Sequence, residues 1–243
     1  MAWFEEPNRR RGGWSGVSRC EVRMPDGGTR ALFVKRQENH GTFSLKHPFR
    51  GVPTFEREFK HLMNYRAKGI PTLEPVYYAA RQSRGCQRAI LITEELTGFA
   101  SLEDHVNRWL KDGAPQRSTR RQILKSVADL LRLIHANHIQ HSCFLTKHVF
   151  IRLCNDGSVD ARAIDLEKSR WRPFKTLCAM RDLHSLNRFS APWGVVDRVW
   201  FFRTYLGATR LTRYAKWLWH NVASRSMRKN RIGAAQSAFT EKR

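Results

Sequence analysis

The chain has 243 residues, of which 41% are hydrophobic and 11% aromatic, and its formal net charge is +23. This length suits one two-lobed domain or two small ones, and the apolar content supports a packed core, which excludes a disordered chain. The longest apolar runs are far shorter than the roughly 18 residues that a membrane span needs, and the N-terminus lacks a basic-then-apolar signal pattern. We therefore expect a cytoplasmic protein.

The charge and the cysteines narrow the class of partner. The excess of positive charge predicts a polyanionic neighbour, either nucleic acid, an anionic membrane face or a phosphorylated substrate, although a basic surface can also serve solubility alone. The five cysteines are widely spaced and form no C-x-x-C pair. This spacing argues against a zinc cluster or a disulfide framework and favours free thiols in a reducing compartment.

Residues 20–95 predict a small sheet interrupted by one helix. The turn at residues 25–28 separates the two strands of a hairpin, and residues 38–52 are expected to form a loop. Residues 53–65 predict a helix, because apolar side chains recur on one face. That face consists of Phe55, Phe59, Leu62 and Met63. The strands are expected at residues 21–24, 30–36, 76–79 and 89–93.

From residue 96 onward the apolar pattern becomes mainly helical. Ser101 is expected to cap a helix over residues 102–110, and a long helix begins at Ser118 or Thr119. The buried face of the long helix is expected to hold Ile123, Val127, Leu130, Leu131 and Ile134. Two short strands, at 149–152 and 161–164, flank a hairpin turn. We therefore expect an N-lobe over residues 1–95, a C-lobe over 96–223 and a basic, disordered tail over 224–243.

Several residues fit the parts that phosphoryl transfer requires. Lys35 ends a predicted strand, where a lysine can neutralise nucleotide phosphates, and Glu58 lies on the next helix, where a carboxylate can hold that lysine. Glu56 is the competing partner, but its offset from the apolar face is less favourable. Gly12, Gly13 and Gly16 precede a strand and could form a loop over the phosphates, or simply a mobile N-terminal loop.

The later parts follow in the same order. Residues 93–98 come after an apolar strand and are expected to be the hinge, where backbone groups of Glu94 and Leu96 would bind adenine. Asp165 follows a short strand, and its carboxylate is the type of ligand that Mg²⁺ prefers. An ordinary turn aspartate is the alternative. Glycine loop, strand lysine, helix glutamate, catalytic loop and magnesium aspartate form the protein-kinase order.

Residues 133–151, LIHANHIQHSCFLTKHVFI, resemble the catalytic loop of the bacterial lipopolysaccharide core kinases, which include the heptose and Kdo kinases. Residues 181–186 and 202–207 resemble the downstream helices of that family. The resemblance covers roughly residues 8–210 and is strongest to the InaA-type branch. It implies an α+β, protein-kinase-like fold with a small β-rich N-lobe containing one helix and a mostly helical C-lobe. It also implies ATP- and Mg²⁺-dependent phosphorylation of an inner-core sugar at the cytoplasmic membrane face.

The catalytic loop departs from the family pattern at one position. Active relatives carry H-x-D, whereas this chain has Cys143 in place of the aspartate, and no acidic residue lies between Leu130 and Asn155. Cys143 as a thiolate, or His141, is a candidate base. The structural alternatives are a packed thiol and a histidine that holds the loop through a bond to the region of Asp182. His148 occupies the metal-binding asparagine position, but its nitrogen suits Mg²⁺ poorly, so it could bind phosphate or shape the loop.

Two functions are therefore expected within this fold. One is a slow or specialised sugar kinase, which we favour, and the other is a pseudokinase that binds nucleotide and regulates a partner. A basic nucleic-acid-binding protein is a third alternative from a different class. It would explain the charge, but it leaves the ordered positions of Lys35, Glu58 and Asp165 unexplained.

The C-terminal region predicts contact with an anionic partner. Residues 210–243 contain nine Lys and Arg residues and one acidic residue, and residues 211–222 predict a helix with Trp217 and Trp219 near the edges of its apolar face. Basic residues with tryptophan suit an interface with anionic lipid or with lipopolysaccharide phosphates, which implies peripheral membrane contact. A helix packed on the C-lobe core is the alternative.

Overall fold

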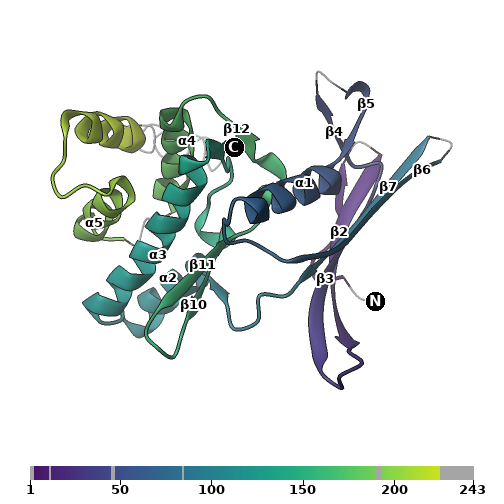
Figure 1. Cartoon of the computed structure of the whole chain (residues 1–243), viewed down its shortest axis with the longest axis horizontal. Helices are drawn as coiled ribbons and strands as arrows, with labels where there is room; N and C mark the ends of the chain where they lie inside the picture. Colours follow the sequence, from purple (N-terminus) through teal and green to yellow (C-terminus); the bar gives the residue numbers. More distant parts are fainter. Residues whose placement is uncertain (1–2, 11, 45–46, 84, 190–192, 225–243) are drawn as a thin grey trace, which may run out of the picture. The chain divides into compact units, whose positions relative to one another are not determined.

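The computed structural model describes residues 3–10, 12–44, 47–83, 85–189 and 193–224, without the side chains of residues 42–50 (Figure 1). The chain divides into two compact units. The first consists of Met1–Phe99 with Arg162–Lys168, and the second of Ala100–Ala161 with Ser169–Arg243. The first unit thus includes the segment around Asp165, which the sequence assigns to the C-lobe. The expected tail, apart from Ser224, lies outside the described residues.

A five-stranded antiparallel sheet forms most of the first unit, in the order β1-β2-β3-β7-β6. Its strands are β1 (Asn8–Arg10), β2 (Gly13–Arg23), β3 (Thr29–Glu38), β6 (Pro75–Ser83) and β7 (Cys86–Glu94). The predicted hairpin between β2 and β3 is confirmed, and Gly27 supplies the positive φ of 80° that its turn requires. The loop expected at 38–52 is wrong, because β4 (Gly41–Ser44) and β5 (His47–Pro53) pair as a second hairpin.

α1 (Thr54–Ala67) packs against β6 and β7 and confirms the predicted helix. Phe55, Leu62 and Tyr65 are buried, and the Phe55 N–H donates to Gln37 Oε1 at 2.9 Å, which satisfies one of the donors left open at a helix start. The expected burial of Met63 is wrong, because its side chain is 47% exposed. Met63 lies one residue beyond Leu62, about 100° further round the helix, and so leaves the apolar face.

The second unit is mainly helical. Its helices are α2 (Leu102–Asp112), α3 (Arg117–Ala136), α4 (Lys175–Phe189) and α5 (Val195–Leu206), followed by a helical segment over residues 213–224. Three short strands form a small sheet in which β10 (Val149–Leu153) lies between β8 (Ala100–Ser101) and β11 (Val159–Ala163). The last residues of β11 belong to the first unit. A separate pair is formed by β9 (Ile139–Gln140) and β12 (Arg170–Trp171). Two short 3₁₀ helices are η1 (Thr146–His148) and, in the first unit, η2 (Leu166–Lys168).

The long helix α3 supplies the core of the second unit. All five side chains predicted for its buried face are at most 4% exposed: Ile123, Val127, Leu130, Leu131 and Ile134. The regular three- and four-residue spacing of these side chains places them on one stripe. Within the described part of the chain, no helix is both long enough and apolar enough to cross a bilayer.

The N-terminus of α2 carries a capping box, as Ser101 in the sequence predicts. Ser101 Oγ accepts the Asp104 N–H at 3.0 Å, and the Asp104 carboxylate accepts the Ser101 N–H at 3.2 Å. We expect Ser101→Ala to lower the free energy of unfolding by about 1 kcal/mol, because a buried helix start loses its cap. Chemical denaturation would measure this loss, and Asn107→Ala on the exposed face of α2 should cause no comparable loss.

Candidate active site

Lys35 and Glu58 form a closed ion pair in the first unit. Lys35 Nζ lies 2.5 Å from Glu58 Oε1, and the two side chains are 17% and 3% exposed. β3 presents Lys35 opposite Leu91 of β7, and α1 carries Glu58 on its buried face. The competing Glu56 pairs instead with Lys60, at 2.5 Å, one turn further along α1. A nearly buried carboxylate therefore holds a lysine that is still partly open to solvent.

Asp165 belongs to the same unit as this pair. The strand before it is tied to the segment after α1, because Thr72 Oγ1 donates to the Ala163 carbonyl at 2.7 Å and the Ala163 N–H donates to the Pro71 carbonyl at 3.2 Å. η2, which begins one residue after Asp165, packs against α1. Asp165 has a φ of 60°, an uncommon conformation for a residue other than glycine and one that is often found at functional sites.

Backbone conformation and packing account for the three glycines. Gly12 has a φ of 77° in the turn between β1 and β2, whereas Gly13 and Gly16 lie within β2 rather than before a strand. A side chain on Gly13 would collide with the Asn39 backbone, and one on Gly16 would collide with the Trp3 ring. These close contacts require glycine without any ligand, so the phosphate-binding role of the three glycines stays a prediction.

The expected hinge follows β7. The Glu94 N–H donates to the Glu74 carbonyl at 2.9 Å, and the Glu94 side chain pairs with Arg30 at 2.8 Å. Leu96 accepts the Phe99 N–H at 3.1 Å through its carbonyl, but its own N–H makes no hydrogen bond to any described residue. The Leu96 N–H is therefore a backbone donor of this segment that a nucleotide base could use.

Phe33 is a further candidate site residue, which the sequence analysis did not identify. It lies two residues before Lys35 on β3, and strand alternation places both side chains on the same face of the sheet. Phe33 pairs in register with Thr93, next to the hinge, and its ring packs edge-on against Phe4 with centroids 5.2 Å apart. A base held at Leu96 with phosphates at Lys35 would pass Phe33. In the sequence, the spacing of two residues from Lys35 on the same strand indicates that Phe33 shares its face of the sheet.

The catalytic-loop residues lie in the second unit. His141 has no solvent exposure, and its Nδ1 accepts the Cys143 N–H at 3.3 Å, which gives the ring a structural position inside the loop. Cys143 is a half-buried free thiol. His148 Nδ1 lies 2.9 Å from the Cys143 carbonyl, which can only accept, so Nδ1 carries the hydrogen. In the neutral ring the lone pair is then on Nε2, where it can accept a proton, whereas Mg²⁺ prefers oxygen ligands.

Asp182 of α4 holds this loop in place, which confirms the expected link between His141 and the region of Asp182. It is fully buried and accepts the His141 N–H at 2.7 Å and the Ser142 N–H at 2.8 Å. His135 Nε2 lies 3.1 Å from the same carboxylate, and Tyr205 OH lies 2.8 Å from His135 Nδ1. Burial raises the pKa of Tyr205 above its usual value, so the phenol stays protonated and can donate to His135.

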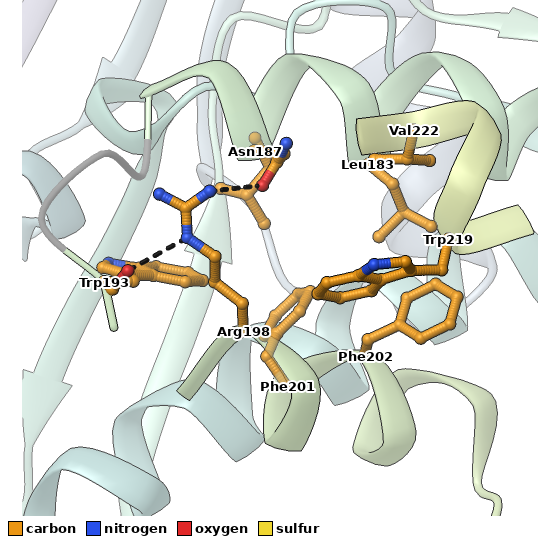
Figure 2. Close-up of a pocket in the computed structure, with 9 residues that line it drawn as sticks. Leu183, Asn187, Trp193, Arg198, Phe201, Phe202, Trp219 and Val222 are labelled. Carbon is orange, nitrogen blue, oxygen red and sulfur yellow. Dashed lines mark hydrogen bonds between the residues drawn. The ribbon is translucent and has the colours of Figure 1, made fainter. Parts of the chain in front are cut away.

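A separate apolar pocket in the second unit is lined by α4, α5 and the helical segment 213–224 (Figure 2). Trp219 faces into it and packs edge-on against Phe202, with centroids 5.3 Å apart. Arg198 spans the polar side, donating to the Trp193 carbonyl and to Asn187 Oδ1 at 3.0 Å each. Trp219 is therefore a packing residue of this unit rather than a surface residue.

Metal binding would rest on few protein ligands. Among the described residues, no group of three or more His, Cys, Asp or Glu side chains is placed to hold a metal ion. Mg²⁺ in kinases is commonly bound by one or two carboxylates together with phosphate oxygens, so a single Asp165 carboxylate fits a metal that arrives with nucleotide. It does not fit a metal held by the protein alone.

A small antiparallel sheet with a lysine–glutamate pair and a helical remainder define a kinase-like fold. The lipopolysaccharide kinase (Kdo/WaaP) family model matches residues 1–205, and the chain belongs to this family. Protein InaA of Escherichia coli K12 is 33% identical over 193 residues, which cover 78% of this chain and 84% of InaA. The lipopolysaccharide core heptose(I) kinase WaaP of Escherichia coli is 28% identical over 180 residues, covering 68% of this chain and 63% of WaaP.

A solved structure supports the fold. The chain superimposes on WaaP from the structure titled "WaaP in complex with acyl carrier protein" with a TM-score of 0.70, over 93% of this chain and 89% of that one. The sequence identity is 20%, so this similarity shows the fold alone. The predicted α+β, kinase-like fold and the predicted family are both confirmed.

Proposed function

We propose that this protein is a kinase that uses ATP and Mg²⁺ to phosphorylate a hydroxyl group of a lipopolysaccharide inner-core sugar, at the cytoplasmic face of the membrane. The closed Lys35–Glu58 pair, in the same unit as Asp165, is the observation that carries this proposal. Family membership and the resemblance to WaaP support the class of acceptor. Lipopolysaccharide or another phosphorylated glycolipid is therefore the proposed partner.

Each residue has a definite role in this proposal. Bound ATP would supply the transferable phosphoryl group, and Mg²⁺ would neutralise its charge. Lys35 would contact phosphate oxygens while Glu58 orients its ammonium group, and Asp165 would provide the carboxylate for the metal. The Leu96 N–H would hold the base. His148 Nε2 would accept the proton of the acceptor hydroxyl, a task that Cys143 is poorly suited to as a thiol.

A nucleotide-binding regulator without transferase activity is a second candidate. Cys143 at the position of the usual aspartate is the observation that favours it. Phosphoryl transfer depends mainly on positioning and charge, so replacing the usual aspartate by a different base such as His148 slows the reaction by a factor of up to about 10²–10⁴ without excluding it. We favour the kinase because the chain belongs to the lipopolysaccharide kinase family and keeps the Lys35–Glu58 pair.

Two measurements test the proposal. ATP with Mg²⁺ should raise the melting temperature of the wild type, and Asp165→Ala should lose that shift, because the metal loses its carboxylate ligand. Asp112→Ala at the exposed end of α2 is the matched control. Labelled ATP with core lipopolysaccharide should then label the glycolipid.

The outcomes separate the two candidates. A thermal shift with labelled glycolipid supports the kinase. A shift that depends on Asp165, with glycolipid labelling no greater for the wild type than for Asp165→Ala, supports the regulator. The absence of any shift in the wild type, or an equal shift for Asp165→Ala, would contradict nucleotide binding at this site.

A further inference from the structure

Exposed aromatic and apolar side chains gather where the start of α4 meets the helical segment 213–224. Phe174 is 68% and Leu177 44% exposed at the start of α4, and Tyr214 and Trp217 are each 47% exposed on the segment. Thr176 Oγ1 and Tyr214 OH lie 3.0 Å apart, which joins the two elements. The rings of Tyr214 and Trp217 stack with centroids 5.9 Å apart. We name Phe174, Leu177, Tyr214 and Trp217 the aromatic surface.

The two tryptophans of the segment 213–224 have opposite roles. Trp219 packs into the pocket between α4 and α5 (Figure 2), together with the buried Leu218 and Val222 on the same side of the helix. Trp217 lies on the other side, among exposed residues. The segment is therefore anchored to its own unit by one face and presents the opposite face to the surroundings. Packing of this segment on the core therefore does not explain why aromatic side chains stand at the exposed positions 214 and 217.

The aromatic surface is bordered by positive charge. Lys175 lies in the first turn of α4, and Arg213 and Lys216 lie on the exposed side of the segment. Within the described part of the chain, none of the three makes an ion pair. Residues 169–224 contain ten Lys and Arg residues and two acidic ones. Both acids are occupied, because Asp182 is fully buried and Asp197 pairs with Arg120 at 2.9 Å.

We propose that the aromatic surface, with Lys175, Arg213 and Lys216, docks this protein on an anionic lipid bilayer. Tryptophan and tyrosine suit the headgroup region, phenylalanine and leucine can enter the acyl boundary, and the cations are attracted to anionic lipids. Single-stranded nucleic acid would use the aromatic rings and the cations but would leave Leu177 without a role. The inference rests on the membrane location in the proposed function and names the surface that makes the contact, but docking itself requires neither nucleotide nor catalysis.

Sedimentation of the full chain with phosphatidylglycerol–phosphatidylcholine vesicles tests this surface. We expect the wild type to bind them and to bind pure phosphatidylcholine weakly, with the binding falling as salt rises. The triple variant K175Q/R213Q/K216Q should bind at least about tenfold more weakly, because it removes three local charges. Its matched control is K60Q/R88Q/K125Q, which removes three exposed cations elsewhere and leaves the same net charge.

A second pair of variants tests the apolar half of the surface. F174S/W217S should also weaken binding about tenfold or more, whereas Y77S/L110S, which changes two exposed side chains elsewhere, should not. Trp217→Phe should retain binding but lose part of the blue shift in tryptophan fluorescence on vesicle addition. Unchanged circular dichroism and melting temperatures establish that the variants are folded.

Several outcomes would overturn the proposal. One is equal weakening by the surface and control variants, which would show that total charge alone drives binding. Another is that both surface variants bind as well as the wild type while removal of residues 225–243 abolishes binding, which would assign the binding to those residues. A third is a wild-type dimer that the surface variants convert to a monomer, which would assign the surface to self-association. Because these readouts use no nucleotide, they stand apart from any failure of the kinase proposal.

Discussion

Cys143→Asp is expected to raise the rate of phosphoryl transfer to core lipopolysaccharide by at least about tenfold. This gain is part of the factor of about 10²–10⁴ that a positioned base typically contributes. The loop contacts at this position use the backbone, since the Cys143 N–H donates to His141 Nδ1 and its carbonyl accepts from His148 Nδ1. Replacing the side chain therefore leaves both hydrogen bonds in place. The new carboxylate would occupy the position of the aspartate in active relatives, where it can orient the acceptor hydroxyl.

Cys143→Asn is the matched control for that gain. It has the shape of aspartate but no basic oxygen pair, so transfer should stay near the wild-type rate, and the thermal shift with ATP and Mg²⁺ should not change in either variant. A pH–rate profile distinguishes the roles further, because an added carboxylate should extend activity to lower pH. A fall in rate for both Cys143→Asp and Cys143→Asn would instead identify the thiol as a working group.

The pairing of Lys35 with Glu58 could be predicted because its signals are local. Lys35 follows the apolar residues 31–34, although β3 continues to Glu38 beyond the strand end expected near Lys35. Glu58 lies on the buried face of the next helix, so strand alternation and helix periodicity bring the two side chains together without knowledge of the rest of the fold. The choice of Glu58 over Glu56 follows from the same periodicity, and the 2.5 Å contact agrees with it. The family and the fold class were likewise predictable, because the order of these parts is distinctive.

Other features depend on partners far away in the sequence. Gly13 and Gly16 are required by the Asn39 backbone and the Trp3 ring, and no local pattern separates such packing glycines from a phosphate loop. Trp217 and Trp219 are two residues apart on the segment 213–224, and the packing of this segment against α4 and α5 decides which one enters the pocket. Sequence periodicity gives the faces of a helix but not the element that covers each face.

Asp182 is the clearest case of a long-range role. The sequence placed it in a helix that resembles the family, but its hydrogen bonds connect it to residues 40 and 41 positions earlier. Ser142 has a φ of 69°, so the loop turns sharply here. The Asp182 carboxylate supplies the acceptor that the N–H groups of His141 and Ser142 need. The unusual loop therefore rests on a buried charge in α4, independently of the residue at position 143.

Asp182→Asn is expected to lower the free energy of unfolding by about 3 kcal/mol or more, which corresponds to a fall of about 6–12 °C in melting temperature. The carboxylate accepts from three donors: the His141 N–H, the Ser142 N–H and His135 Nε2. An asparagine would turn its amide nitrogen toward one of these donors, and an unsatisfied buried N–H costs about 1–3 kcal/mol in addition to the lost charge-assisted bonds. Chemical denaturation and calorimetry would measure the change.

Asp129→Asn makes the same chemical change on the surface of α3, where Asp129 pairs with Lys125 and Arg132. Exposed pairs of this kind contribute about 0–1 kcal/mol, so this variant should lose far less stability. Hydrogen exchange adds a local readout, because the His141 and Ser142 amides should lose protection in Asp182→Asn alone. Equal destabilisation by the two variants, with protection retained at residues 141 and 142, would contradict a loop-holding role for Asp182. The expected result would mean that α4, rather than the catalytic loop's own sequence, fixes the geometry in which Cys143 and His148 meet a substrate.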